Sequence, residues 1–243
     1  MIKAVLKFEM IRFFKQPINI IFSIIMPILL LVLMNSLTQK YVKDYNIADY
    51  YLPMFMIILS IIFVLTTIPM PWIVGRLYKE FKLICISRLG IKKYILLLFA
   101  FNLILFFSEG FILFIISLIF FKLNITFLSI LDIFIVPFIS FCCCFSIAMV
   151  IPNFSKTIKG TMSMSMLVLY VIMLISGVTI PIFVFPDWWK YIQIIIPIGG
   201  CAKVSYDLLT NSANYFDILY ISIQLLYISV FTVLFVKKLY AQI

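Results

Sequence analysis

Long apolar runs alternate with short polar and basic connections along this chain. A helix needs about 20 apolar residues to cross roughly 30 Å of hydrocarbon. The runs are continuous, as in residues 95–107, and do not alternate residue by residue, so they predict helices and not the strands of a membrane barrel. The six predicted spans are residues 17–38, 51–75, 95–120, 127–151, 162–184 and 216–236.

The amino-acid composition indicates whether these helices lie in water or in a membrane. Hydrophobic residues make up 65% of the 243 residues, and the mean hydropathy is +1.24. A soluble domain of this size could not bury that much apolar surface. We therefore expect an all-α polytopic membrane protein, in which residues 1–243 form a single transmembrane domain.

The basic residues are distributed unevenly between the two sides of the predicted bundle. Cytoplasmic connections retain positive charge during insertion. Of the 19 lysines and arginines, 14 lie before span 1, between spans 2 and 3, between spans 4 and 5, or after span 6. We therefore expect both termini to be cytoplasmic. The net charge of +10 follows from this topology, because the charges flank spans and form no stripe for nucleic-acid binding.

The first 16 residues precede the first span, and as a helix they would have an apolar side and a basic side. Ile2, Leu6, Met10 and Phe13 share one side of a helix, and the lysines lie on another. This pattern predicts a helix lying in the cytoplasmic interface, although a simple basic flank also accounts for the charges. The apolar run that follows is too long for a cleaved signal peptide, so we expect a retained first helix.

Residues 185–215, between the last two spans, do not resemble a solvated loop. Prolines at 181, 186 and 197 interrupt helix formation, and residues 188–196 are apolar but too short to span. Such a segment predicts short helices that re-enter the outer leaflet, where protein shields the broken backbone. Trp188, Trp189 and Tyr191 are expected as aromatic anchors at the membrane interface.

Several kinds of chemistry are missing from the sequence. It contains no histidine, no G-x-S-x-G elbow and no H-E-x-x-H helix, which argues against the common hydrolase and metalloprotease schemes. Three consecutive cysteines, 142–144, point in different directions on a helix, so we expect no metal site. The sequence also lacks a G-x-x-x-x-G-K-[ST] phosphate loop, so ATP and Mg are expected on a partner chain, with no cofactor bound directly.

In the stretch from Ser176 to Asp207, the chain resembles the permease subunits of ABC-2 type exporters. That family has six helices, an S-G-x-x-x-P stretch closing the fifth, an F-P-x-W turn and a later N-P motif followed by an acidic residue. Ile196 stands where the family usually has asparagine. The resemblance implies a transport path or gate formed by the matching positions. The motif matches are Ser176, Gly177 and Pro181, then Phe185, Pro186 and Trp188, then Pro197 and Asp207; of these, Gly177, Pro181, Pro186, Trp188 and Pro197 are expected to form the path or gate.

The resemblance also gives a role to the basic connection at residues 76–94. In the family, the corresponding segment is a cytoplasmic coupling helix that docks on a separate ATPase. An ordinary basic inside loop would explain the charges but not the apolar spacing of Phe81, Ile84 and Leu89. The residues expected to take part in coupling are Lys79, Glu80, Phe81, Lys82, Leu83, Ile84 and Arg88.

Glu109 lies in the middle of the third span, where a charged side chain costs roughly 2.5 to 3.5 kcal/mol on insertion scales. It either lines the transport path or is protonated and hydrogen-bonded to a neighbouring helix. Ser108 and Gly110 beside it would permit close helix packing.

The resemblance implies an ATP-driven exporter in a bacterial plasma membrane. Its expected partners are two ABC ATPase subunits and a second permease, either an identical copy or a homologue. Hydrophobic or amphipathic cargo is expected, either an antimicrobial or toxic peptide or a lipophilic drug. The alternative is an autonomous ion-coupled carrier in which Glu109 titrates, and a nontransporting membrane protein is the third possibility.

Overall fold

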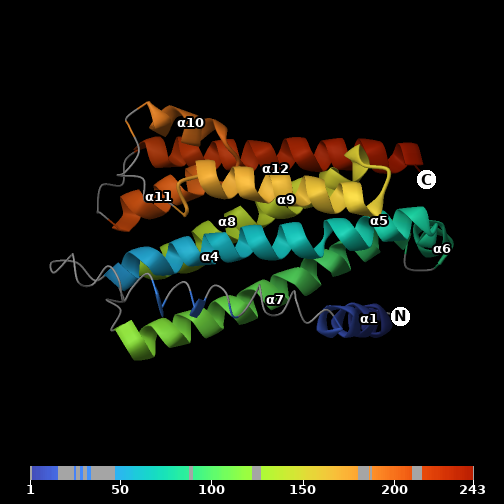
Figure 1. Ribbon diagram of the computed structural model, residues 1–243, viewed down its shortest axis with the longest axis horizontal. Coiled ribbons are helices and arrows are strands. Elements are labelled where there is room, and N and C mark those ends of the chain that lie inside the picture. Colours follow the sequence, from blue (N-terminus) through green and yellow to red (C-terminus); the bar gives the residue numbers. More distant parts are fainter. Residues whose placement is uncertain are drawn as a thin grey trace.

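The computed structural model describes residues 2–15, 25, 28–29, 32–33, 47–87, 90–121, 127–179, 186, 188–209 and 215–242. These residues form helices and turns, with no strand among them. Long helices lie side by side, and shorter ones cap both ends of the bundle (Figure 1). In chain order the elements are α1 (Ile2–Phe14), α4 (Ile47–Thr67), α5 (Pro69–Leu77), α6 (Glu80–Ile86), α7 (Gly90–Phe121), α8 (Phe127–Val150), η2 (Ile151–Phe154), α9 (Ile158–Ile175), α10 (Trp189–Ile195), α11 (Gly199–Leu209) and α12 (Tyr215–Gln242).

Within the described residues, five helical stretches are long and apolar enough to cross a membrane. They coincide with predicted spans 2 to 6, so the multi-pass, all-helical character is confirmed. The predicted first span, residues 17–38, lies outside the described residues except at positions 25, 28–29 and 32–33, so the count of six stays a prediction. The five stretches are Tyr51–Leu77, Gly90–Phe120, Asp132–Phe154, Ile158–Ile175 and Asp217–Lys237.

The second predicted span consists of two helices. α4 ends at Thr67, and α5 begins at Pro69 after the single residue Ile68. Pro69 and Pro71 have no N–H and cannot continue the helical hydrogen-bond pattern. The hydroxyl of Thr67 donates to the carbonyl of Phe63 at 2.7 Å. The chain therefore continues in nearly the same direction, although the helical hydrogen-bond pattern is interrupted. For this reason the sequence shows α4 and α5 as one apolar run.

The fifth predicted span, residues 162–184, corresponds to a shorter helix. α9 begins at Ile158, where the Thr157 hydroxyl caps it by accepting a hydrogen bond from the Gly160 N–H at 3.1 Å. It ends at Ile175, and Gly177 follows with φ of +79°. This left-handed conformation favours glycine and terminates the helix. At 18 residues, α9 is about 27 Å long, slightly less than the roughly 30 Å of hydrocarbon in a bilayer.

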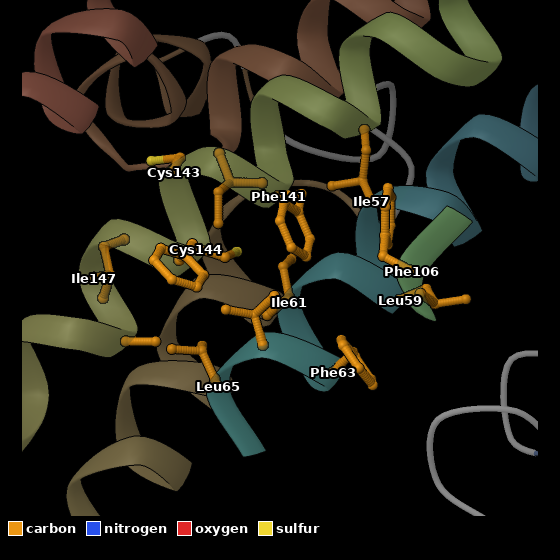
Figure 2. Close-up of a cluster of buried hydrophobic side chains, with 14 of the residues drawn as sticks. Ile57, Leu59, Ile61, Phe63, Leu65, Phe106, Phe141, Cys143, Cys144 and Ile147 are labelled. Carbon is orange, nitrogen blue, oxygen red and sulfur yellow. The ribbon is translucent and has the colours of Figure 1, made fainter. Parts of the chain in front are cut away.

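The centre of the bundle is the packing of α4 against α8, with α7 contributing aromatic rings. Figure 2 shows the side chains of Ile57 and Ile61 from α4 facing Phe141 from α8. The Phe141 ring stacks on Phe106 of α7, with centroids 5.0 Å apart. Polar groups also meet at this interface, where the hydroxyls of Ser60 and Ser140 lie 2.8 Å apart.

The two ends of the bundle are built from different elements (Figure 1). One end, called the α6 end here, holds α1, α6 and the last turns of α12. The opposite end, called the α10 end, holds α10 and the first turns of α12. Both chain termini lie at the α6 end, as the charge distribution predicts for termini on one side of the membrane.

α1 is attached to the α6 end by one polar and one aromatic contact. The Tyr94 hydroxyl of α7 donates to Glu9 Oε1 at 3.2 Å, and Arg12 Nη1 lies 3.9 Å from the same oxygen. Burial raises the pKa of the Glu9 carboxyl above its ordinary value, and Arg12 partly opposes this. The buried Phe13 ring contacts Phe63 of α4, with centroids 6.0 Å apart. That α1 lies in the membrane interface stays a prediction.

Candidate functional site

The corner between α5 and α6 is the candidate functional site at the α6 end. α5 ends at Leu77 and α6 begins at Glu80, so only two residues separate them. Lys79, the N-cap of α6, has φ of +59°, a left-handed conformation uncommon outside glycine. This turn sends α6 away from the direction of α5, at the tip of the bundle (Figure 1).

Phe81 attaches α6 to the bundle. Its ring is buried, and its centroid lies 4.4 Å from that of Trp72 on α5. A Cβ placed on Gly75 would come within 2.8 Å of the Phe81 ring, so the ring occupies space that only glycine leaves open. Trp72 also contacts Phe235 of α12, with centroids 5.2 Å apart. The three rings therefore connect α6, α5 and α12.

The outer face of α6 is apolar and uncovered. Leu83 is 70% exposed and Ile86 is 85% exposed, and Tyr78 in the preceding turn is also exposed. α6 itself lies at the tip of the bundle (Figure 1). Adjacent large apolar side chains with this exposure are typical of an interaction site.

Arg76, at the end of α5, connects this corner to α9. Its Nη2 donates to the carbonyl of Ser155 at 2.5 Å. Ser155 lies between η2 and α9, and its hydroxyl is hydrogen-bonded to that of Thr161 in the first turn of α9. The corner is therefore joined through Ser155 to the start of α9.

The structure divides the predicted coupling residues into two groups. Glu80, Lys79 and Leu83 are exposed, whereas Phe81 is buried and Ile84 is half-buried against the core. Phe81 therefore positions α6, and its ring is not available to a partner. The backbone of Lys82 lies in α6, and Arg88 lies outside the described residues.

The predicted path residues lie mostly at the other end of the bundle. Gly177 is buried just after α9, and Pro186 is exposed with its carbonyl accepting from the Trp189 N–H at 2.9 Å. Trp188 is exposed and packs edge-on against Trp189. Pro197, between α10 and α11, is half-buried, and Pro181 lies outside the described residues.

Glu109 does not share a site with these residues. It belongs to α7, which lies on the far side of α4 from α9 and α10 (Figure 1). Its side chain is 3% exposed. The adjacent Gly110 is in close contact with Met56 of α4, since an added Cβ would lie 2.7 Å from the Met56 methyl group. Glu109 is therefore placed beside a close contact between α7 and α4.

α11 is held by polar side chains that the sequence analysis did not select. The buried Ser205 hydroxyl donates to Asp132 Oδ1 of α8 at 2.6 Å. The backbone N–H of Ile198 donates to Gln224 Oε1 of α12 at 2.7 Å. Gln224 is the single amide side chain in the sixth predicted span, so the sequence alone could have indicated that it has a structural role. Asp132 was harder to find, because its position near the start of a window suggests a solvated helix end.

Titratable groups do not cluster into a metal site in the described part of the chain, where no set of three cysteine, aspartate or glutamate side chains could hold an ion. The candidate site therefore has two parts. One is the apolar outward face of α6, and the other is a chain of packed rings and hydrogen bonds that leads from α6 to α5, α9 and α12. This arrangement suits binding and mechanical transmission better than bond-making chemistry.

Comparisons with known proteins give one family. The model of the ABC-2 type transporter family matches residues 1–199, from α1 to the start of α11. No curated protein and no solved structure matches the chain. Members of this family are transport permeases and not catalysts themselves. Because the match covers most of the sequence, the chain belongs to the ABC-2 type transporter family and is a membrane domain of an ABC transporter permease.

Proposed function

We propose that this chain is the permease subunit of an ATP-driven exporter and that a separate ABC ATPase binds it at the α5–α6 corner. The observation that carries the proposal is the exposed pair Leu83 and Ile86 on a helix whose opposite face is fixed by Phe81. An interface of this kind needs apolar anchors on a rigid support. ATP and Mg belong to the partner, because the chain has no phosphate loop.

Movement of α6 would be transmitted to three helices. Phe81 contacts Trp72 of α5, and Trp72 contacts Phe235 of α12. Arg76 connects α5 to Ser155 and so to the start of α9. Packed interfaces respond to displacement by shifting between discrete arrangements and not by continuous deformation. Closure of the ATPase is therefore proposed to shift α5, α9 and α12 relative to the central pair, α4 and α8.

The α10 end supports an outer gate. Ile198 is bonded to Gln224, and the Tyr227 hydroxyl donates to the carbonyl of Ile195. Gln224 and Tyr227 lie about 14 and 18 Å along α12 from Tyr215, at 1.5 Å per residue. The turn between α10 and α11 would therefore reach about halfway across the hydrocarbon layer, which supports a re-entrant segment. We assign the gate to Gly177 and to the segment from Pro186 to Pro197.

The proposed cargo is a hydrophobic or amphipathic molecule taken from the membrane, first an antimicrobial or toxic peptide and second a lipophilic drug. A cavity of about 250 Å³ between α8, α9 and α12 supports this class, because its lining is apolar and includes Pro197 from the proposed gate. The proposed assembly has two permease copies, or one copy with a homologue, and two ATPases. Its place is a bacterial plasma membrane, with the α6 end in the cytoplasm.

Transport into inside-out vesicles tests this function. Vesicles containing the chain and its co-purifying ATPase are expected to accumulate a labelled amphipathic peptide when ATP is supplied. Arg76→Leu removes the donor to Ser155 and is expected to lower transport about tenfold, within the range of known coupling free energies. The ATPase should still co-purify with this variant, and Arg76→Lys, which keeps a donor, should retain more transport.

The alternative function is an ion-coupled carrier, favoured by the burial of Glu109 in the middle of a span. A carrier would accumulate cargo in vesicles that contain an ion gradient but no ATP, and Glu109→Gln would abolish this activity. Accumulation without ATP would overturn the exporter proposal. Accumulation with ATP that Glu109→Gln leaves unchanged would exclude the carrier.

A further inference from the structure

A second cavity lies at the α6 end, away from the proposed gate. It has a volume of about 420 Å³, within the range of small-ligand pockets, and is formed by α7, α8 and α12. Apolar side chains such as Ile95, Phe145 and Phe235 make most of its wall. Lys92 supplies the one charged group among the described lining residues.

The two hydroxyls in the wall are already used. Ser146 donates to the carbonyl of Cys142 at 2.9 Å, and Thr232 donates to the carbonyl of Ile228 at 2.8 Å, each within its own helix. Neither hydroxyl proton is therefore directed to a ligand. The cavity is chemically simple, with an apolar body and a single ammonium group that belongs to the first turn of α7.

Further positive charge surrounds the same end. Lys93 follows Lys92 and is exposed, and exposed Lys237 follows the lining residue Val236 on α12. No carboxylate lines the cavity within the described residues. An anion would thus be attracted to the lysine end of the cavity and would meet no like charge on its wall.

The cavity is open to lipid, because α7 and α12 are both peripheral. Only 28% of the span residues are buried in α7 and 11% in α12. We infer that the cavity binds an anionic phospholipid of the cytoplasmic leaflet, with its phosphate at Lys92 and one acyl chain against the apolar wall. Basic pockets between membrane helices on the cytoplasmic side suit this class of ligand. This inference does not depend on the ATPase.

Trp72 supplies a reporter for this site, since its ring contacts Phe235, which lines the cavity. The chain has three tryptophans, so Trp188→Phe with Trp189→Phe leaves Trp72 as the only one. This full-length chain is placed in nanodiscs that contain phosphatidylglycerol or phosphatidylcholine with brominated acyl chains, which quench tryptophan at short range. The quenching curves give the relative binding constant of the two lipids.

The expected preference for phosphatidylglycerol is about fivefold, the factor for one lysine near a membrane surface. Lys92→Gln should remove the preference and Lys92→Arg should keep it. Lys93→Gln is the matched control, because Lys93 carries the same charge one residue away and does not line the cavity. Equal quenching by the two lipids in the parent chain, or equal loss in both glutamine variants, would overturn the inference.

Native mass spectrometry gives a second measurement that needs no Lys92 variant. The parent chain in detergent with phosphatidylglycerol is expected to retain one lipid per chain, and to retain less phosphatidylcholine under the same conditions. Retention of neither lipid would contradict a built site. A dimer whose subunits exclude lipid from the cavity would contradict it as well.

Discussion

The central helices and the peripheral helices of this protein are all apolar enough to cross a membrane, but they differ sharply in burial. In the spans formed by α4–α5 and by α8 with η2, 78% and 72% of the residues are buried, compared with 22% in α9 and 11% in α12. The same pattern of continuous apolar residues predicted all four of these spans. Hydrophobicity therefore identifies a helix that enters the membrane, but it does not tell whether protein or lipid covers that helix.

Buried small polar side chains occur in both groups, at the places where helices pack against each other. Ser60 and Ser140 meet in the interface of the central pair, and both are fully buried. In α9, the small residues Thr161 and Ser165 are buried, while Met162, Met164 and Met166 are exposed. Small residues allow close approach of helices, so the buried Thr161 and Ser165 mark the side of α9 that packs against the protein. The methionine side of α9 remains available to lipid or to a second permease.

The largest expected effect comes from removing a ring at the centre. Phe141→Ala deletes a fully buried side chain that stacks on Phe106, and the loss should be about 3 kcal/mol, near the lower end of values for buried phenylalanine. Phe111→Ala on the exposed face of α7 is the matched control and should cost less than about 0.5 kcal/mol. Unfolding in mixed micelles measures both. Equal losses would abolish the distinction between central and peripheral positions.

The next effect concerns the attachment of α11 to the central helix α8. Asp132→Ala leaves the buried Ser205 hydroxyl without its acceptor, which should cost about 1 to 3 kcal/mol, whereas Asp132→Asn keeps an acceptor oxygen. The readout is maleimide labelling of the buried Cys201 on α11, in a chain whose other four cysteines are alanine. Labelling should be faster in the alanine variant only. If labelling is the same in all three chains, the bond does not hold α11 in place.

A smaller effect is expected for the serine pair of the central interface. A double-mutant cycle with Ser60→Ala and Ser140→Ala should give a coupling energy of about 0.6 kcal/mol, typical of hydrogen bonds between membrane helices. A matched cycle with Ser60→Ala and Ser222→Ala, where Ser222 is exposed on α12, should give none. Coupling in the second cycle would mean that the method does not isolate direct contacts.

The smallest effect lies at the edge of the bundle, where α1 is attached to α7 through Glu9. Burial raises the pKa of this carboxyl in the folded chain. The unfolded chain therefore loses its proton at lower pH than the folded one, so stability falls as pH rises from the ordinary carboxyl value through the folded value. Glu9→Gln should remove this part of the pH dependence, measured by thermal unfolding in detergent. An unchanged pH profile would show that Glu9 is not the responsible group.

Much of the fold could be predicted from the sequence. Continuous apolar runs predicted spans 2 to 6, because a membrane helix must satisfy its backbone internally and cover itself with apolar side chains. The break at Pro69 was hidden, since both flanking segments are apolar and lie nearly in line. The end of α9 at Ile175 was also hidden, because Gly177 and its left-handed backbone lie inside an apolar window.

That residues 76–94 form a coupling segment stays a prediction, and the contacts made by its residues could not be predicted from the sequence. The family motif identified the connection at residues 76–94, yet periodicity alone could not tell which apolar residues of α6 face inward. Phe81 is buried because Gly75 leaves space beside Trp72, a contact between residues of two helices. Arg76 was treated as topological charge, and its bond to Ser155 depends on how α9 packs. Such tertiary contacts are not encoded in local spacing.

The docking role of α6 is tested most directly by co-purification from the native host in mild detergent. An ABC ATPase should be recovered with the parent chain and lost when Leu83→Ser and Ile86→Ser are combined. The matched control combines Ile115→Ser and Ile119→Ser, which removes two exposed apolar side chains from α7, away from the corner. ATPase recovery with the control but not with the α6 variant is the predicted result. An ATPase that stays bound to the α6 variant, or that never co-purifies with the parent chain, would contradict docking at this corner.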